Sequence, residues 1–260
     1  MRKGRILAIL ALIAGLSLMV FAGVRLREAQ EVYKEGDSAY TDLRERVKGK
    51  SASASGDTTR MQAQYAYAST GFPAEIPKQD IDFKALRRIN PDAAAWLYCP
   101  DTVIDYPVMA AEDYSYYLDH LPDGRWNANG SLFIDFNTAS DFSSPLTVIY
   151  GHHMRSGKMF GGLEGYKKQG YFKQHPYLFL YTEEESYRIE LVYGCVIGAG
   201  QWRDRAFMYA ENLASLLAYA AYNTTFQSDA PFEEGDRFVA LATCSYEFDD
   251  ARYIVIGVLR

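Results

Sequence analysis

The stretch FVALATCSYEFDDARYIVIGVL, residues 238–259, decides the fold expected of this chain. It contains two apolar runs, 238–242 and 253–259, on either side of a short polar segment. Both runs are apolar at consecutive positions, which is typical of strands that are buried on both faces. We therefore predict two late strands inside a covered sheet, with a turn between them if the two strands are neighbours.

Further strands are expected ahead of this pair. Residues 103–108, 131–136 and 146–150 are rich in β-branched or aromatic residues and are bounded by turn residues. Residues 187–197 alternate, so their odd-numbered side chains are expected on one face of a strand. Many short strands with few helices indicate a mainly β fold, either a closed barrel or a sandwich.

Two helices are expected beside these strands. Residues 80–95 are predicted to form a helix where the folded domain starts, and residues 211–223 a helix before the last two strands. The later helix has one apolar side, which consists of Leu213, Leu216, Leu217 and Ala220.

Composition excludes several classes of function. The chain has 260 residues and a formal net charge of -6, so a basic nucleic-acid-binding surface is not expected. Its three cysteines form neither a Cys-x-x-Cys pair nor a Cys/His cluster with zinc spacing. The sequence therefore predicts no metal and no cofactor.

Residues 6–24 carry no charge and predict a transmembrane signal-anchor. Nineteen helical residues extend about 28 Å, close to the thickness of the hydrocarbon core. Arg2, Lys3 and Arg5 precede the run, which favours a cytoplasmic N-terminus over residues 1–5 and a single pass through the cell membrane. The alternative is a cleaved signal peptide, although the run is longer than an ordinary signal core.

Residues 25–76 are predicted to be a stalk and flexible linker outside the cell. The stalk has one narrow apolar stripe of Tyr40, Leu43 and Val47 at helical spacing. Residues 49–56 are rich in Ser, Ala and Gly, as flexible linkers are. The folded domain is predicted to cover 77–260, and a chain that begins near Gly56 is expected to fold alone.

Three side chains suggest acyl-transfer chemistry. Cys244 stands at the end of the first late strand, and Arg252 opens the second. His152 follows Gly151 at the end of the strand predicted over 146–150. Thiol, imidazole and guanidinium can supply the nucleophile, the proton shuttle and the stabiliser of developing charge that acyl transfer requires.

Other roles for these residues stay open at this level. Cys244 could be a buried structural thiol, as free cysteines often are. His153 is the rival of His152, although adjacent side chains usually point apart. Cys195 lies on the apolar face of an alternating strand and is interpreted as a core residue, and a disulfide between Cys99 and Cys195 remains an alternative.

Several short motifs occur in a fixed order over roughly residues 81–260. They are NPD at 90–92 with WL at 96–97, TVIDYPV at 102–108, GSLFID at 130–135, YGHHM at 150–154 with GKMF at 157–160, YF at 171–172 with HP at 175–176, and TCSYEF at 243–248. In these motifs the chain resembles the sortases, and among them class B.

The resemblance implies a fold and a set of residue roles. It implies an eight-stranded sortase-type β-barrel with N-terminal helices and the active site at its mouth. It implies that Cys244 is the nucleophile, His152 the acid and base, and Arg252 the stabiliser of substrate and oxyanion. Thr243 and Ser245, which flank Cys244, are candidate substrate-binding residues. Ala240 and Ala242 depart from residues common in the family, which puts substrate preference in question more than chemistry.

The resemblance also implies a cysteine transpeptidase, an enzyme of the peptidase and acyltransferase type. Such an enzyme cleaves a C-terminal sorting motif of secreted proteins through a thioester and transfers them to a peptidoglycan amine at the cell wall. Its catalytic domain is expected outside the cell, facing the wall. One alternative is a pilin-polymerising sortase, in which the amine is a lysine of another subunit. A membrane-tethered wall-binding module with an inert thiol is the non-enzymatic alternative.

Overall fold

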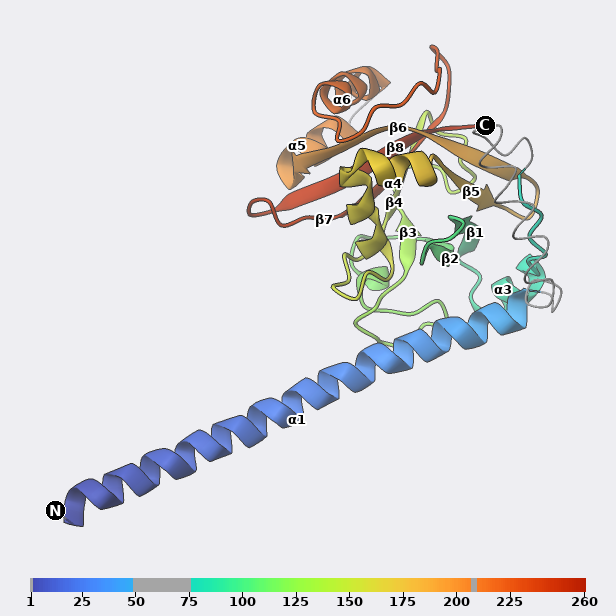
Figure 1. The fold of residues 1–260 in the computed structure, drawn as a ribbon. Helices are drawn as coiled ribbons and strands as arrows, with labels where there is room; N and C mark the ends of the chain where they lie inside the picture. The colour runs from blue at the N-terminus through green and yellow to red at the C-terminus, as the bar shows by residue number, and fades with distance from the viewer. Residues whose placement is uncertain (1, 49–75, 207–209) are drawn as a thin grey trace.

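The computed structural model describes residues 2–48, 76–206 and 210–260, and the side chains of residues 2–11, 13, 29, 205, 206, 210 and 211 lie outside that description. Within the described residues, eight strands close into a barrel in the order β1-β2-β3-β4-β7-β8-β6-β5 (Figure 1). The strands are β1 (Ala93–Tyr98), β2 (Asp105–Ala110), β3 (Leu132–Ile134), β4 (Leu146–Tyr150), β5 (Tyr177–Tyr181), β6 (Ser186–Gly198), β7 (Phe238–Cys244) and β8 (Ala251–Leu259). The predicted barrel is confirmed, and the sandwich alternative is wrong.

Helices flank the barrel on several sides. They are α1 (Arg2–Val47), α3 (Phe83–Ile89), the 3-10 helices η2 (Tyr116–Leu118) and η3 (Phe160–Lys167), α4 (Gln169–Gln174), α5 (Ala199–Ala206) and α6 (Ala210–Tyr222). Helices α5 and α6 lie together beside β6 and β8, while α1 runs past the opposite side of the barrel (Figure 1). The helix predicted over 211–223 is confirmed as α6, and α5, which precedes it, was not predicted.

Strands β7 and β8 are buried on both faces, as their continuous apolar runs predicted. Val239 and Val255 point into the core cluster that fills the barrel. Ala240 and Ile256 belong to a second cluster, which also contains Leu216 of α6. Because the side chains of a strand alternate between faces, each late strand contributes to both cores.

Strand β6 departs from the predicted pattern. Its pairing with β8 shifts register between Leu191 and Tyr193, as a β-bulge does. Ile189 and Leu191 therefore lie in the barrel cluster, whereas Cys195 lies in the outer cluster. The prediction that all odd-numbered residues of 187–197 share one face is wrong, because one extra residue reverses the alternation.

The helix predicted over 80–95 is shorter in the structure. Asp82 caps α3 by accepting a hydrogen bond from the backbone N–H of Ala85 at 2.8 Å. Asn90 ends the helix in an extended conformation immediately before Pro91, because the residue before a proline disfavours the helical region. Residues from Ala93 onward form β1 instead.

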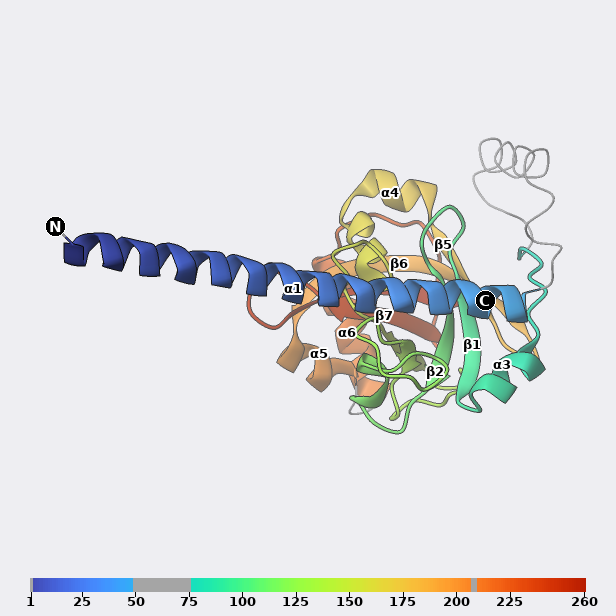
Figure 2. The ribbon, with the colours of Figure 1, turned by 90° about the horizontal axis from the view of Figure 1, so that it is seen from below.

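The C-terminal part of α1 packs against the barrel, which it crosses in the view of Figure 2. Tyr40, Leu43 and Val47 belong to the barrel's core cluster, and the Tyr40 hydroxyl donates to the Gly130 carbonyl at 2.6 Å. A Cβ added to Gly36 would lie 2.2 Å from Asn129 Nδ2, so only glycine permits this approach. The C-terminal part of α1, which lies in the segment predicted as a stalk and flexible linker over 25–76, is thus a structural element of the folded unit.

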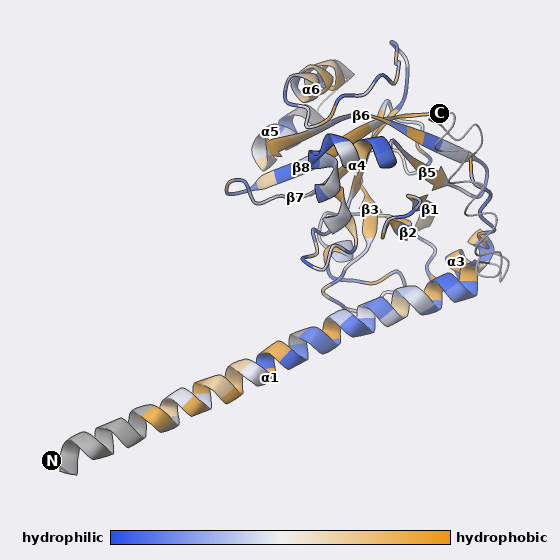
Figure 3. Cartoon of the chain, viewed as in Figure 1, coloured by the Kyte–Doolittle hydropathy of each residue, from blue (hydrophilic) through white to orange (hydrophobic). Residues whose placement is uncertain are grey.

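In the part of helix α1 that Figure 3 colours by hydropathy, the residues change from mainly hydrophobic to mainly hydrophilic toward the C-terminal end of the helix. Among the described residues, no helix combines the length and the apolar character needed to cross a membrane. The segment predicted to span it, 6–24, includes residues 6–11 and 13, whose side chains lie outside the description.

Candidate active site

Cys244 and Arg252 face each other at one end of the barrel. They are the last register pair between the antiparallel strands β7 and β8, so their Cα atoms stand about 5 Å apart. Cys244 is exposed, although the six residues before it in β7 are buried. Among the residues that the structure describes, no carboxylate forms an ion pair with Arg252, whose Nη1 donates to the carbonyl of Ala251 at 3.0 Å.

The Gly151–His152 segment reaches the same end from β4. Strands β4 and β7 are parallel, and the ladder continues beyond β4 because the Gly151 N–H donates to the Ala242 carbonyl at 3.2 Å. A Cβ on Gly151 would lie 2.4 Å from a Leu132 methyl and 2.7 Å from the Phe160 ring. Glycine is therefore required at this turn, which carries the chain into the two histidines.

The two histidines have different partners. His152 Nε2 donates to the carbonyl of Leu118, the last residue of η2, at 2.5 Å. His153 Nδ1 donates to the carbonyl of Cys244 at 2.7 Å, and its ring meets the edge of Tyr246 with centroids 5.0 Å apart. The residue that contacts the cysteine backbone is thus His153, and sequence reasoning had treated it only as a rival.

The hydroxyls of Thr243 and Ser245 have partners within the protein. Thr243 is buried, and its Oγ1 donates to the Gly151 carbonyl at 2.8 Å. Ser245 is buried too, and its hydroxyl lies between Lys167 and Glu247. Both side chains therefore hold the loops around Cys244 together, and the substrate-binding role of these two residues stays a prediction.

Sequence reasoning missed a charged group beside Cys244. Lys167 Nζ donates to Glu164 Oε1 at 2.6 Å and also pairs with Glu247. Burial works to raise the pKa of Glu247, but hydrogen bonds from Lys167 and Ser245 outweigh it and hold this pKa at about 2. Glu247 lies in the TCSYEF motif and could have been singled out, whereas Lys167 stands in no motif.

All three cysteines are described, and none of them forms a disulfide. Cys99 and Cys195 are buried in different core clusters, so the alternative of a disulfide between them is wrong. Burial raises the pKa of Cys99 to about 11 despite the hydrogen bond with Tyr166. Cys244 is the cysteine with an accessible thiol.

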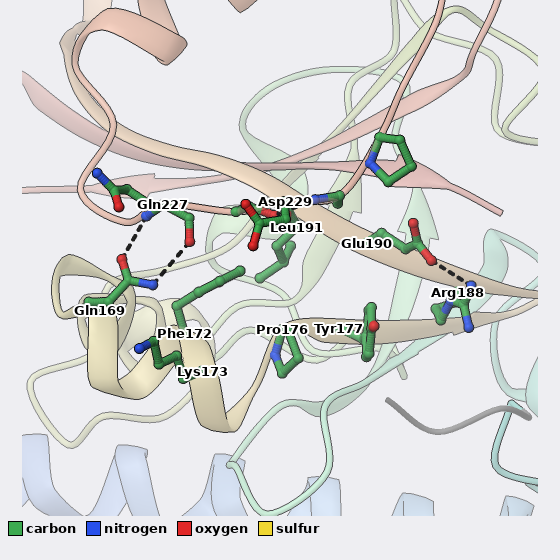
Figure 4. A pocket seen from close by; sticks show the side chains of 13 residues that line it. Gln169, Phe172, Lys173, Pro176, Tyr177, Arg188, Glu190, Leu191, Gln227 and Asp229 are labelled. Atoms are coloured by element: carbon green, nitrogen blue, oxygen red, sulfur yellow. Dashed lines mark hydrogen bonds and ion pairs between the residues drawn. The ribbon is translucent and has the colours of Figure 1, made fainter. Parts of the chain in front are cut away.

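A groove of about 760 Å³ lies well away from Cys244, between α4, β6 and residues 227–231. Figure 4 shows Gln169 and Gln227 joined by two hydrogen bonds at one end and the Arg188–Glu190 ion pair at the other. Leu191 lines the groove and pairs with Gly257 of β8. Gly257 lies five residues from Arg252, which is roughly 17 Å along the strand. The groove is therefore separate from the candidate active site.

No family model matches the chain. Among curated proteins it is similar to Sortase B of Listeria monocytogenes, with 28% identity over 182 residues, which cover 68% of this chain and 74% of the relative. It is also similar to Sortase B of Staphylococcus aureus, with 24% identity over 180 residues, which cover 68% of this chain and 73% of the relative.

Solved structures agree with these relatives. Sortase B of Clostridium perfringens matches with a TM-score of 0.63 and 28% identity, over 68% of this chain and 99% of that one. A Streptococcus pyogenes class B sortase involved in pilus biogenesis matches with a TM-score of 0.61 and 28% identity, over 68% of this chain and 97% of that one. The resemblance to class B sortases is confirmed: they are homologues of this chain, and they share its barrel.

Proposed function

We propose that this chain, whose homologues are class B sortases, is a cysteine transpeptidase that cleaves a C-terminal sorting motif of secreted proteins and transfers them to an amine of the cell wall. The observation that carries the proposal is the pairing of the exposed Cys244 with Arg252 across the end of β7 and β8. The Gly151 N–H donates to the Ala242 carbonyl, two residues before Cys244, which supports His152 as the third group.

The proposed reaction has two acyl-transfer steps. In the first, the thiolate of Cys244 attacks the carbonyl carbon of the scissile amide, the C–N bond breaks, and protonated His152 gives its proton to the leaving amine. A thioester links the secreted protein to Cys244. In the second, the acceptor amine attacks this thioester, His152 takes its proton, and the thiolate leaves. Arg252 donates hydrogen bonds to the oxyanion of both tetrahedral intermediates.

His152 fits the proton shuttle better than His153. The His153 side chain is 11% exposed, and its Nδ1 is engaged by the Cys244 carbonyl. His152 is held by one carbonyl, that of Leu118 in η2, and forms no ion pair with a carboxylate among the described residues. A rotation that breaks this one hydrogen bond frees the His152 ring for proton transfer.

The test uses a fluorogenic peptide that carries a sorting motif, with an added amine as acceptor. We expect wild type to form an acyl-enzyme visible by intact mass, and Cys244→Ala to form none. His152→Ala should lose about 10²–10⁴-fold in rate, the usual contribution of acid–base catalysis. Peptide binding without any adduct in wild type would instead identify a wall-binding module with an inert thiol.

Pilin polymerisation is a second candidate, which the similarity to the S. pyogenes class B sortase involved in pilus biogenesis favours. The chemistry is the same, and only the acceptor amine differs. Competition between a peptidoglycan peptide and a lysine-bearing pilin domain for the same acyl-enzyme distinguishes them, because the natural acceptor should resolve the thioester faster.

We also propose, from the uncharged run at 6–24 alone, that the chain is anchored in the cell membrane with its barrel facing the wall. The expected result is that the full chain stays with membranes in alkaline carbonate, while a chain lacking residues 1–27 is released. Release of the full chain by carbonate would contradict the anchor.

A further inference from the structure

A group of five polar side chains lies around the Cys244–Ser245 dipeptide, where His153 contacts the Cys244 backbone directly. It joins three segments: the loop after β4, the helix η3 and the turn between β7 and β8. We call this group the η3 brace, and its members are His153, Glu164, Lys167, Ser245 and Glu247. None of these residues is a nucleophile, acid or oxyanion donor in the proposed reaction.

Lys167 is the centre of the brace. Its Nζ donates to Glu164 Oε1 at 2.6 Å, to Ser245 Oγ at 3.0 Å and to Glu247 Oε1. An ammonium group has three N–H donors, so these three acceptors use all of them. The same Nζ lies 5.1 Å from the ring centroid of Tyr253 in β8, and the side chain is 21% exposed. Lys167 is thus held from four directions rather than extended into solvent.

His153 completes the brace from the β4 side. A carbonyl oxygen can only accept a hydrogen bond, so the contact with the Cys244 carbonyl requires the proton on His153 Nδ1. The same nitrogen lies 3.9 Å from Glu164 Oε1, the atom that also accepts from Lys167. Lys167 and His153 therefore both lie next to the same carboxylate oxygen, Glu164 Oε1.

Lys167 and His153 converge on the Cys244–Ser245 dipeptide. His153 holds the carbonyl of Cys244, and Lys167 holds the hydroxyl of Ser245. The Ser245 N–H in turn donates to the Ala251 carbonyl at 2.9 Å, and the same carbonyl accepts from Arg252 Nη1 at 3.0 Å. The brace therefore holds the backbone segment that connects Cys244 to Arg252.

We propose that Lys167 and His153 are positioning residues, which hold the Cys244–Ser245 peptide in the orientation that sets the thiol against Arg252 and the substrate carbonyl. The inference rests on the proposed function. Displacement of a reacting group by about 1 Å can cost about 10²-fold in rate. Loss of the brace is therefore expected to lower kcat, and to leave KM and the pH dependence of the reaction nearly unchanged.

The experiment compares variants of the full chain in cleavage of a sorting-motif peptide, at a temperature where each variant is folded. We expect Lys167→Met, which keeps the length of the side chain without its charge, to lower kcat about tenfold or more, with KM within about twofold. Lys173→Met makes the same change on the exposed face of α4, outside the brace, and should behave as wild type.

His153 provides a second, independent pair of variants. The amide Nδ2 of asparagine can donate from nearly the position of histidine Nδ1, so His153→Asn should keep most of the rate that His153→Ala loses. If His153→Asn is as inactive as His153→Ala and one limb of the pH profile disappears, His153 is an acid or base and the inference is overturned.

The outcomes separate the brace from the proposed function. Wild-type kcat in both Lys167→Met and His153→Ala, with Cys244→Ala inactive, overturns the brace alone. Cleavage by Cys244→Ala overturns the proposed function itself. If Lys167→Met does not fold, the two His153 variants still decide the question, because His153 lies at the edge of the network rather than at its centre.

Discussion

The three thiols differ in their surroundings, and these differences predict their reactivity. Cys244 is exposed, whereas burial raises the pKa of Cys99 to about 11 and Cys195 lies in the core beside α6. Because the thiolate is the reactive form, iodoacetamide at pH 7.5 should label native protein once, on Cys244. Intact mass should show one adduct in native wild type, none in Cys244→Ala and three in denaturant. An adduct on native Cys99 would contradict this assignment.

Arg252 tests whether positive charge alone is sufficient at this position. A guanidinium is planar and offers five donors in a fixed fork, so it can bond a substrate carbonyl and an oxyanion together. Lysine provides one strongly hydrated point charge. We therefore expect Arg252→Lys and Arg252→Ala each to lose about 10²-fold or more in peptide cleavage, the scale set by loss of an oxyanion donor.

The pH dependence of Cys244 alkylation serves as the control for Arg252. It should change little in both variants if the guanidinium acts on the substrate rather than on the thiol. Near-wild-type cleavage by Arg252→Lys would show that charge is sufficient and would remove the bidentate role.

At the scale of single elements, the turn between β7 and β8 is secured by the Lys167–Glu247 ion pair. The pKa of Glu247 is about 2 in the folded protein against a usual value of 4.5, so its carboxylate stabilises the fold fully above about pH 4.5. This stabilisation is lost as the pH falls toward 2. The difference in unfolding free energy between wild type and Glu247→Gln should be constant from pH 5 to 8 and should shrink below pH 4, as measured by urea denaturation. A difference that grows on acidification would show the sign to be reversed.

Helix α1 is the second element whose role can be measured. Deletion of residues 1–55 removes the buried side chains of Tyr40, Leu43 and Val47, whereas deletion of residues 1–27 keeps them. We expect the longer deletion to cost about 3 kcal/mol or more of unfolding free energy, the scale of losing a large buried side chain. Thermal unfolding followed by circular dichroism measures the difference. Equal unfolding midpoints for the two deletions would mean that the packing of α1 against the barrel does not stabilise the fold.

For the whole molecule, the barrel brings three distant segments to one end. Residues near 152, 167 and 244 meet because β4 lies parallel to β7 and because η3 crosses back over the strand ends. The outer cluster with α6 covers the late strands on their second face. A rigid, doubly covered pair of strands is a suitable support for a thiol and a guanidinium that, in the proposed reaction, must keep their spacing during two acyl transfers.

Several features of this protein followed from its sequence alone. The runs at 238–242 and 253–259 predicted doubly buried strands, because burial on both faces requires apolar residues at consecutive positions. Two neighbouring strands that are joined by a short turn form a hairpin. If the two late strands are neighbours, the pairing of Cys244 with Arg252 could therefore also be predicted. The apolar side of α6 followed from helical periodicity, and the ordered motifs indicated the barrel.

Only the tertiary structure decided the rest. The bulge in β6 moved Cys195 to the outer core, and no local pattern marks one extra residue in a strand. The docking of α1 depends on the fit of Gly36 to Asn129, which lies 93 positions away. Likewise, His153 reaches the Cys244 carbonyl, and Lys167 reaches Ser245, only after the barrel closes. The periodicity of apolar residues in the sequence predicts which face of an element is buried. Contacts between distant polar side chains depend instead on how the elements come together in space.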